Sequence, residues 1–122
     1  VNHLQGGVVK NTGTIEAGGL VNDGGVVRLV ASDRIELGGN INVDVAPNSS
    51  GKGGKVIAIA SLDNFDSTMN FSGNVSARGG SQGGDGGFVE TSASNVEIHQ
   101  TAYVDTSAEE GETGNWLIDP YD

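Results

Sequence analysis

Two segments of this sequence carry the carboxylates and glycines that a cation or sugar site would need. Asp63 and Asp66 lie close together in the segment 62–68, Leu-Asp-Asn-Phe-Asp-Ser-Thr, where exposed carboxylates could ligate Ca²⁺ or contact a glycan. The segment 79–87, Gly-Gly-Ser-Gln-Gly-Gly-Asp-Gly-Gly, has the composition of Ca²⁺-binding glycine repeats, which need tandem copies with Asp at a fixed place. Only one imperfect copy is present. We therefore interpret both segments as solvated turns and predict no metal or cofactor site.

The basic and nucleophilic side chains show no catalytic spacing. His3 and His99 are the only histidines and the chain has no Cys, so neither histidine has a neighbouring ligand with which to hold a metal. The alternation of its strand predicts that His99 faces solvent. Three hydroxyls occur close together without a Gly-x-Ser-x-Gly elbow or a recognisable base: Thr91, Ser92 and Ser94. We predict no catalytic residue and a chain that is not an enzyme.

The charge balance argues against two classes of partner. The chain has 16 Asp and Glu against 6 Lys and Arg, a net charge of −10, whereas nucleic acids and anionic membrane surfaces are bound through basic patches. No apolar run is long enough to span a bilayer, and no signal peptide opens the sequence, so we expect any targeting segment to lie outside this stretch. We predict no nucleic-acid partner and no membrane insertion.

The charged residues are spread along the whole chain. A polysaccharide lyase would need carboxylates clustered with a basic residue on one face, whereas the basic residues here are scattered: Lys10, Arg28, Arg34, Lys52, Lys55 and Arg78. Several acids alternate with apolar residues, and we predict that they form a solvated outer surface: Glu16, Glu36, Asp44, Glu90 and Glu97. Both features argue against a lyase.

One phrase occurs three times and organises the elements that position these residues. It starts at Gly24, Gly53 and Gly86 as Gly-Gly-x-Val, at intervals of about 30 residues. A period in this range indicates one supersecondary unit stacked on copies of itself. Small or apolar residues then alternate with others, which is the pattern of a strand with one buried face. The copies should place their inward residues in stacked rows: Val27, Val56 and Val89, and Ala31, Ala60 and Ala93.

Each copy contains two further short strands separated by Gly, Asn, Asp and Ser turns. The second strands are expected at residues 35–37, 69–71 and 96–98. The third strands are expected to begin at Ile41, at Val75 and near Ala102 and Val104. The segment 13–18 has the pattern of a third strand from a preceding copy. Thr91 takes an inward position, where we expect a hydrogen bond within its own stacked row.

These patterns predict an all-β chain that forms a parallel β-helix, a solenoid of about four coils. No window places apolar residues at helical spacing, and 21 glycines in 122 residues would break most helices. An antiparallel sandwich is the competing interpretation, but a sandwich has no reason to repeat the same inward residues at the same offsets. Stacked coils do, because each residue touches its equivalent about 4.8 Å above and below.

The expected solenoid is short. About four coils would span on the order of 20 Å, with apolar interior and unpaired strand edges at both ends. We therefore expect residues 1–122 to form a single β-helix segment, a C-terminal portion of a longer solenoid, whose open ends meet neighbouring coils or chains. Residues 109–122 are predicted to form an acidic loop and a terminal strand, with Trp116 mostly buried over the last coil and Pro120 ending the strand.

Three phrases near the end of the sequence carry a family resemblance. They are Gly-Gly-Asp-Gly-Gly-Phe-Val-Glu-Thr-Ser-Ala at 83–93, Val-Asp-Thr-Ser-Ala at 104–108 and Gly-Asn-Trp-Leu-Ile-Asp-Pro at 114–120. Together they resemble the large filamentous haemagglutinin-like exoproteins of Gram-negative bacteria, the passengers of two-partner secretion. The specific phrases cover about 40 residues, and the remainder of the chain matches only through its Gly-Gly-x-Val and Gly-x-Ile pattern.

The resemblance implies a right-handed parallel β-helix, export across the outer membrane by a dedicated barrel transporter, and a non-catalytic role in a secreted or cell-surface adhesin that supports cell adhesion and virulence. The implied partners are that transporter, through parts not in this chain, and a host or bacterial surface glycan or protein. Two other functions stay open. One is the stalk of a contact-dependent growth-inhibition toxin, and the other is a β-helical polysaccharide lyase or hydrolase, which rests on fold analogy alone.

Overall fold

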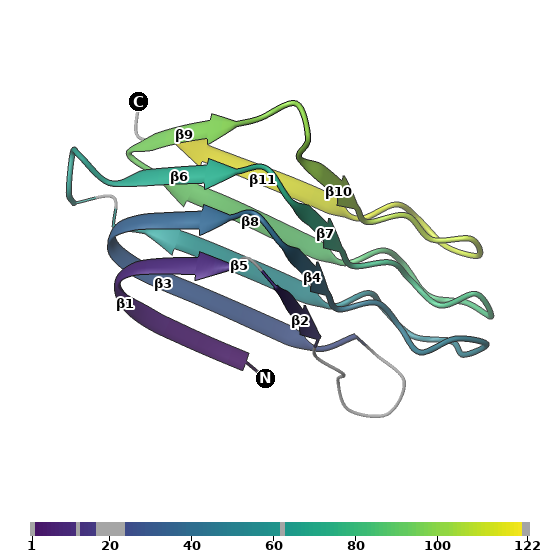
Figure 1. Cartoon of the computed structure of the whole chain (residues 1–122). Coiled ribbons are helices and arrows are strands. Elements are labelled where there is room, and N and C mark those ends of the chain that lie inside the picture. The colour runs from purple at the N-terminus through teal and green to yellow at the C-terminus, as the bar shows by residue number, and fades with distance from the viewer. Residues whose placement is uncertain (1, 12, 17–23, 62, 121–122) are drawn as a thin grey trace.

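The computed structural model describes residues 2–11, 13–16, 24–61 and 63–120 of the chain. These residues form eleven β-strands and no helix, and all the paired strands run parallel. Figure 1 shows the strands stacked coil upon coil, with loops protruding along one side. The expected all-β parallel solenoid is confirmed. The solenoid makes about three turns instead of the expected four. Among the described residues, complete turns that are closed by a loop occur only between Gly24 and Gly114.

The strands form three faces, which we name by their order along each coil. The first face contains the first halves of β1 (Asn2–Asn11) and β3 (Val26–Leu37), then β5 (Lys55–Ala60), β8 (Phe88–Ala93) and β11 (Asn115–Pro120). The second face contains the second halves of β1 and β3, then β6 (Thr68–Phe71) and β9 (Asn95–Ile98). The third face contains β2 (Thr14–Glu16), β4 (Asn40–Asn42), β7 (Asn74–Ser76) and β10 (Tyr103–Asp105).

The interior is filled by stacked rows of small and branched side chains. Val27, Val56 and Val89 pair in register and are fully buried, and the alanines at 31, 60 and 93 are buried beside them. The rows of the second and third faces have the expected register: Ile35, Met69 and Val96; Leu37, Phe71 and Ile98; and Ile15, Ile41, Val75 and Val104. The repeat therefore predicted which strands correspond on every face, although Ile98, at the end of its row, is 39% exposed.

The Gly-Gly step that opens each repeat marks the place where a coil closes on itself. The second glycine of the step donates its N–H to a carbonyl at the end of the third face, as Gly87 does to Ala77 at 2.8 Å. The first glycine lies so close to this end that a Cβ on Gly53 would overlap the Ala77 carbonyl oxygen. A Cβ on Gly87 would overlap the carbonyl oxygen of Gly54 in the coil below. Glycine is therefore required at both positions by close backbone approach.

Two expectations fall partly outside the described residues. The segment 13–18 contains β2 as expected, but residues 17 and 18 are not described. The backbone of His3 pairs with Arg28, whereas its side chain is not among those described.

Candidate functional site

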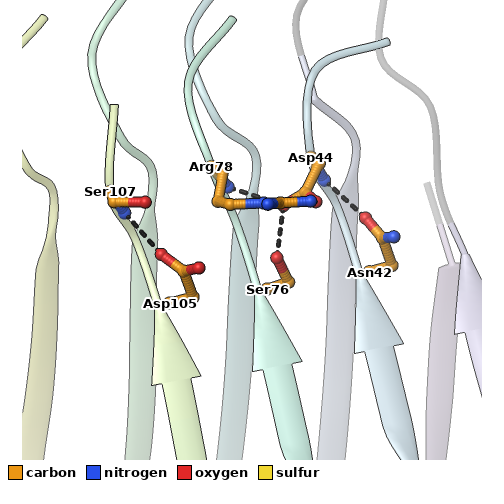
Figure 2. A network of polar contacts seen from close by, with 6 residues as sticks. All are labelled: Asn42, Asp44, Ser76, Arg78, Asp105 and Ser107. Atoms are coloured by element: carbon orange, nitrogen blue, oxygen red, sulfur yellow. Dashed lines mark hydrogen bonds and ion pairs between the residues drawn. The ribbon is translucent and has the colours of Figure 1, made fainter. Parts of the chain in front are cut away.

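A polar network crosses the ends of the third-face strands, as Figure 2 shows. Asp44 follows β4, and Arg78 occupies the equivalent place after β7, one coil further along. Arg78 Nε donates to Asp44 Oδ2 at 3.0 Å, and Arg78 Nη2 lies 2.9 Å from the same oxygen. The Arg78 backbone N–H and the Ser76 hydroxyl donate to Asp44 Oδ1 at 2.7 and 2.6 Å. Asp44 therefore joins two coils through its carboxylate.

This network compensates its own charges. Only 12% of the Asp44 side chain is exposed, against 56% of the Arg78 side chain. The side-chain hydrogen bond with Asp44, together with the attraction of the same carboxylate, raises the pKa of Arg78 above its ordinary value. The prediction that Asp44 belongs to a solvated outer surface is wrong, because Ser76 and Arg78 cover its carboxylate. The other acids of that group lie as expected, with Glu16 and Glu97 exposed and Glu36 and Glu90 half-buried.

The sequence contains a signal for the Asp44–Arg78 pair that we did not use. Each residue lies five positions after the glycine of a Gly-Asn step, Gly39-Asn40 in one repeat and Gly73-Asn74 in the next. Alignment of the repeats at this step places the acid and the base at the same offset in successive coils. Opposite charges at equivalent positions of stacked strands are direct neighbours.

Short-range hydrogen bonds fix the same region in the flanking coils. Asn42 Oδ1 accepts the N–H of Asp44 at 2.8 Å, and Asp105 Oδ1 accepts the N–H of Ser107 at 2.9 Å. Hydrogen bonding from Ser107 lowers the pKa of Asp105 below its ordinary value of 3.8. The turns after β4 and β10 are thus held by a side-chain oxygen located two residues earlier.

A second polar row lies on the outer side of the third face. Asn40, Asn74 and Tyr103 pair in register on β4, β7 and β10, and all three are exposed. Asn74 Nδ2 donates to Asn40 Oδ1 at 3.1 Å, and 59% of Tyr103 is exposed. We call these three residues the amide strip. It presents amide donors and acceptors beside an aromatic ring, which are groups that hydrogen-bond hydroxyls and stack on an apolar ring face.

The loop that contains Asp63 and Asp66 is organised by the residue between them. Asn64 Nδ2 donates to Ser32 O at 3.1 Å and to Asp33 Oδ1 at 3.2 Å in the preceding coil. Its own backbone oxygen accepts the Ser94 hydroxyl of the next coil at 2.7 Å. Asp63 and Asp66 are both exposed, and 70% of Phe65 is exposed at the same loop. Our sequence reasoning considered the carboxylates and missed Asn64, which connects three coils.

The glycine-rich segment 79–87 stacks against the loops of both neighbouring coils through its backbone. Gly83 O accepts the N–H of Gly51 at 2.9 Å, and Gly86 donates its N–H to Glu112 O at 2.8 Å. The Asp85 carboxylate accepts the N–H of Glu112 at 3.0 Å, so it caps the next loop. Gly84 has φ of 107°, a left-handed conformation that favours glycine. The glycines of this segment therefore serve close loop stacking.

The hydroxyls of the first face have structural partners. Ser92 Oγ donates to Glu90 Oε2 at 2.8 Å, and the Ser94 hydroxyl bonds the Asn64 backbone as described above. Thr91 is fully buried and accepts a hydrogen bond from Trp116 Nε1 at 3.1 Å. The expected bond within the row of Thr91 is wrong, because its row neighbours Ala58 and Ile118 carry no polar side-chain atoms.

Trp116 lies over the last coil and most of its surface is buried there, as expected. Its position in β11 corresponds to the inward row of Val89, and it packs against the hydrophobic core. The indole keeps some exposed surface because no further strand lies beyond β11 among the described residues to cover it.

The remaining candidate residues do not assemble into a reactive centre. His99 is exposed, with Nε2 at 3.9 Å from Glu97 Oε1. Across the described part of the chain, no group of three His, Cys, Asp or Glu is arranged to hold a metal ion. The same residues include no helix with the length and hydrophobicity needed to cross a bilayer.

Comparison with protein families, with curated proteins and with solved structures finds no match for this chain. The resemblance to two-partner secretion exoproteins therefore rests on the phrases at 83–93, 104–108 and 114–120. In the geometry described above, the residues stack, form hydrogen bonds between coils and present outer surfaces.

Proposed function

We propose that this chain is a non-catalytic β-solenoid scaffold of a large secreted or cell-surface adhesin of the two-partner secretion type. The Gly-Gly-x-Val-Glu-Thr-Ser and Trp-Leu-Ile-Asp-Pro phrases support the family assignment. Export would use an outer-membrane barrel transporter that recognises parts outside this chain. The segment would hold an adhesive surface away from the cell, and its end coils would stack on neighbouring coils.

The observation that carries this proposal is the continuity of the stack. Val27, Val56 and Val89 are fully buried in one register, and each coil is hydrogen-bonded to the next on all three faces. A filled interior leaves an extended outer surface as the place where a partner can bind. Such a rod resists bending because deformation would break backbone hydrogen bonds along its whole length.

The amide strip is the part of this surface that best suits an adhesive contact with a neutral glycan. Tyr103 offers a ring face, and the amides of Asn40 and Asn74 offer donors and acceptors spaced by one coil, about 4.8 Å. Other than the bond between the two amides, no hydrogen bond from the described residues engages these side chains. A neutral ligand is favoured because the net charge of −10 repels polyanions.

The test is binding of the purified chain to a glycan array and to cell surfaces. We expect Tyr103→Ala and Asn74→Ala each to weaken binding at least fivefold. Asn70→Ala is the matched control, because Asn70 is an outward Asn in the middle of β6 on the second face. Equal binding by all three variants would contradict a role for the amide strip.

Two further outcomes test the adhesin assignment itself. Release of new chain ends from a bound glycan would contradict a non-catalytic scaffold and favour a lyase or hydrolase. Absence of binding to every glycan and cell surface would contradict an adhesive segment and favour an inert stalk, such as that of a contact-dependent toxin.

A further inference from the structure

The outer side of the first face carries more apolar residues than the outer sides of the other two faces. Its apolar outward residues, which we call the first-face patch, are Val26, Val30, Ile57, Ile59, Phe88 and Leu117. Leu117 is 44% exposed, and the others are half-buried. The outward positions of β6, β7 and β9 are instead Thr, Asn, Ser and Glu. A contiguous outer patch of this kind is typical of a surface that another molecule covers.

Two charged residues lie among the residues of this patch, in one row with Ile57. Arg28, Ile57 and Glu90 occupy successive coils in one outward register on β3, β5 and β8. Arg28 is exposed and has no hydrogen-bonding or charged partner among the described residues. Glu90 accepts the Ser92 hydroxyl at 2.8 Å, and no cation among the described residues pairs with it. The row therefore reads positive, neutral, negative across three coils.

This order makes the face complementary to itself. We propose that a second copy of this chain packs on the first-face patch, face to face, about a two-fold axis that runs along β5. Such an axis reverses the order of the coils and keeps the position along the strand. It places Arg28 of each copy opposite Glu90 of the other, and it brings Ile57 and Ile59 against their own counterparts. An isologous contact of this kind is the usual form of a homodimer interface.

The distances suit a stack of two sheets. Packed sheets lie about 10 Å apart, a gap that an Arg and a Glu extended toward each other can bridge. The six-residue strands span about 20 Å, and the five stacked strands of the first face span about 19 Å in the other direction. This footprint, about 400 Å² per copy, is below that of a standard stable interface, so the proposed dimer is a weak one. The dimer should therefore depend on protein concentration within the micromolar range.

The same axis predicts one unfavourable contact. Lys55 is the first residue of β5 and points outward, so the two copies of Lys55 meet near the rim of the interface. Their like charges oppose association, and Lys55→Ser should tighten the dimer. Tighter association of Lys55→Ser is specific to the proposed axis. In an arrangement that does not bring the two Lys55 residues together, removal of a cation from a protein of net charge −10 would increase repulsion between the copies and weaken the dimer.

Sedimentation equilibrium across a range of concentrations at physiological salt tests the proposal. The parent chain should dimerise, and Arg28→Glu or Glu90→Arg should each weaken association at least tenfold. The double variant that carries both changes should regain most of the parent affinity, since it restores both pairs with reversed sign. Arg34→Glu is the matched control, because Arg34 is an exposed Arg of β3 on the second face.

Several results would overturn the inference. If the parent chain sediments as a monomer at every concentration, no second copy binds this face and the proposal is wrong. Equal weakening by Arg28→Glu and Arg34→Glu would show an effect of net charge alone. If the double variant dimerises no more tightly than the single variants, and thermal melting shows that all variants are folded, then Arg28 and Glu90 do not pair across the interface. The adhesive role proposed above does not depend on any of these outcomes.

Discussion

Trp116 on the first face lies edge-on to Phe71 on the second face, with ring centroids 5.7 Å apart and ring planes at 82°. The two aromatic rings meet in the interior near the C-terminal end of the stack, where Phe71 is fully buried. This geometry is favourable for aromatic pairs beyond the area that they bury. Together with the hydrogen bond to Thr91, it makes Trp116 the residue that closes the apolar interior at this end of the stack.

Replacement of this indole should destabilise the fold. We expect Trp116→Ala to lower the free energy of unfolding by about 2 kcal/mol, less than for a fully buried aromatic residue, because Trp116 is half-buried. Tyr103→Ala is the control, since Tyr103 is an exposed aromatic residue one face away. Thermal and denaturant melting measure both. Unchanged melting of Trp116→Ala together with lost glycan binding would show that the indole is a ligand contact.

The stacked valines should tolerate no charge. Val56→Asp would place a carboxylate between Val27 and Val89, where the described neighbours are apolar, and we expect a loss of several kcal/mol. Gln82→Asp, at an exposed loop position, adds the same charge outside the core and serves as the control. Urea denaturation followed by circular dichroism compares them, and a near-parental midpoint for Val56→Asp would disprove the register.

The closing glycines offer a test that changes a single methyl group. Gly53→Ala would push a Cβ into the carbonyl of Ala77 and against the N–H of Gly87, so the backbone of two coils must shift. We expect a loss of about 1–3 kcal/mol, the range of overpacked sites. Gly13→Ala is the matched control, because a Cβ there meets no atom within 4 Å. Similar melting temperatures for the two variants would contradict the close approach.

Asp105 should make a small contribution to stability that depends on pH. Its pKa is lower in the folded chain than the ordinary value of 3.8, so the folded state favours the carboxylate. The contribution is present above the unfolded pKa and is lost as the pH falls through the folded value. Asp105→Asn keeps an acceptor oxygen but cannot titrate. Between about pH 6 and about pH 3 its melting temperature should fall less than that of the parent, and an equal fall would contradict this role.

The sequence repeat predicted the buried rows of the interior well, because each row consists of equivalent residues from successive repeats. Val27, Val56 and Val89 occupy equivalent positions in the sequence and in space. Stacking of the coils brings equivalent positions of successive repeats into contact. Trp116 shows the limit of this reasoning. It occupies the same row as Val89, but at the end of a stack an inward position is only partly covered.

Contacts between non-equivalent positions were not predictable from the repeat. Asn64 reaches Ser32 and Asp33 from a loop that has no counterpart of the same length in the other repeats. Such a loop can fold over its neighbours in many ways, and periodicity contains no information about which one is adopted. The residue types pointed to the exposed acids Asp63 and Asp66 as possible metal or glycan ligands, whereas the neutral side-chain amide of Asn64 makes the contacts that fix the loop.

The hydrogen bonds that close each coil allow the protruding loops to vary independently of the rod. The closing pairs are Val43 with Gly54, Ala77 with Gly87 and Thr106 with Gly114, so segments of three different lengths end at one shared contact. A mutation that lengthens such a segment leaves the register of every strand unchanged. Selection could therefore alter the loops, together with the hydrogen bonds that join neighbouring loops, while the strands of the stack are inherited intact, and a chain of this design could diversify rapidly in sequence without losing its shape.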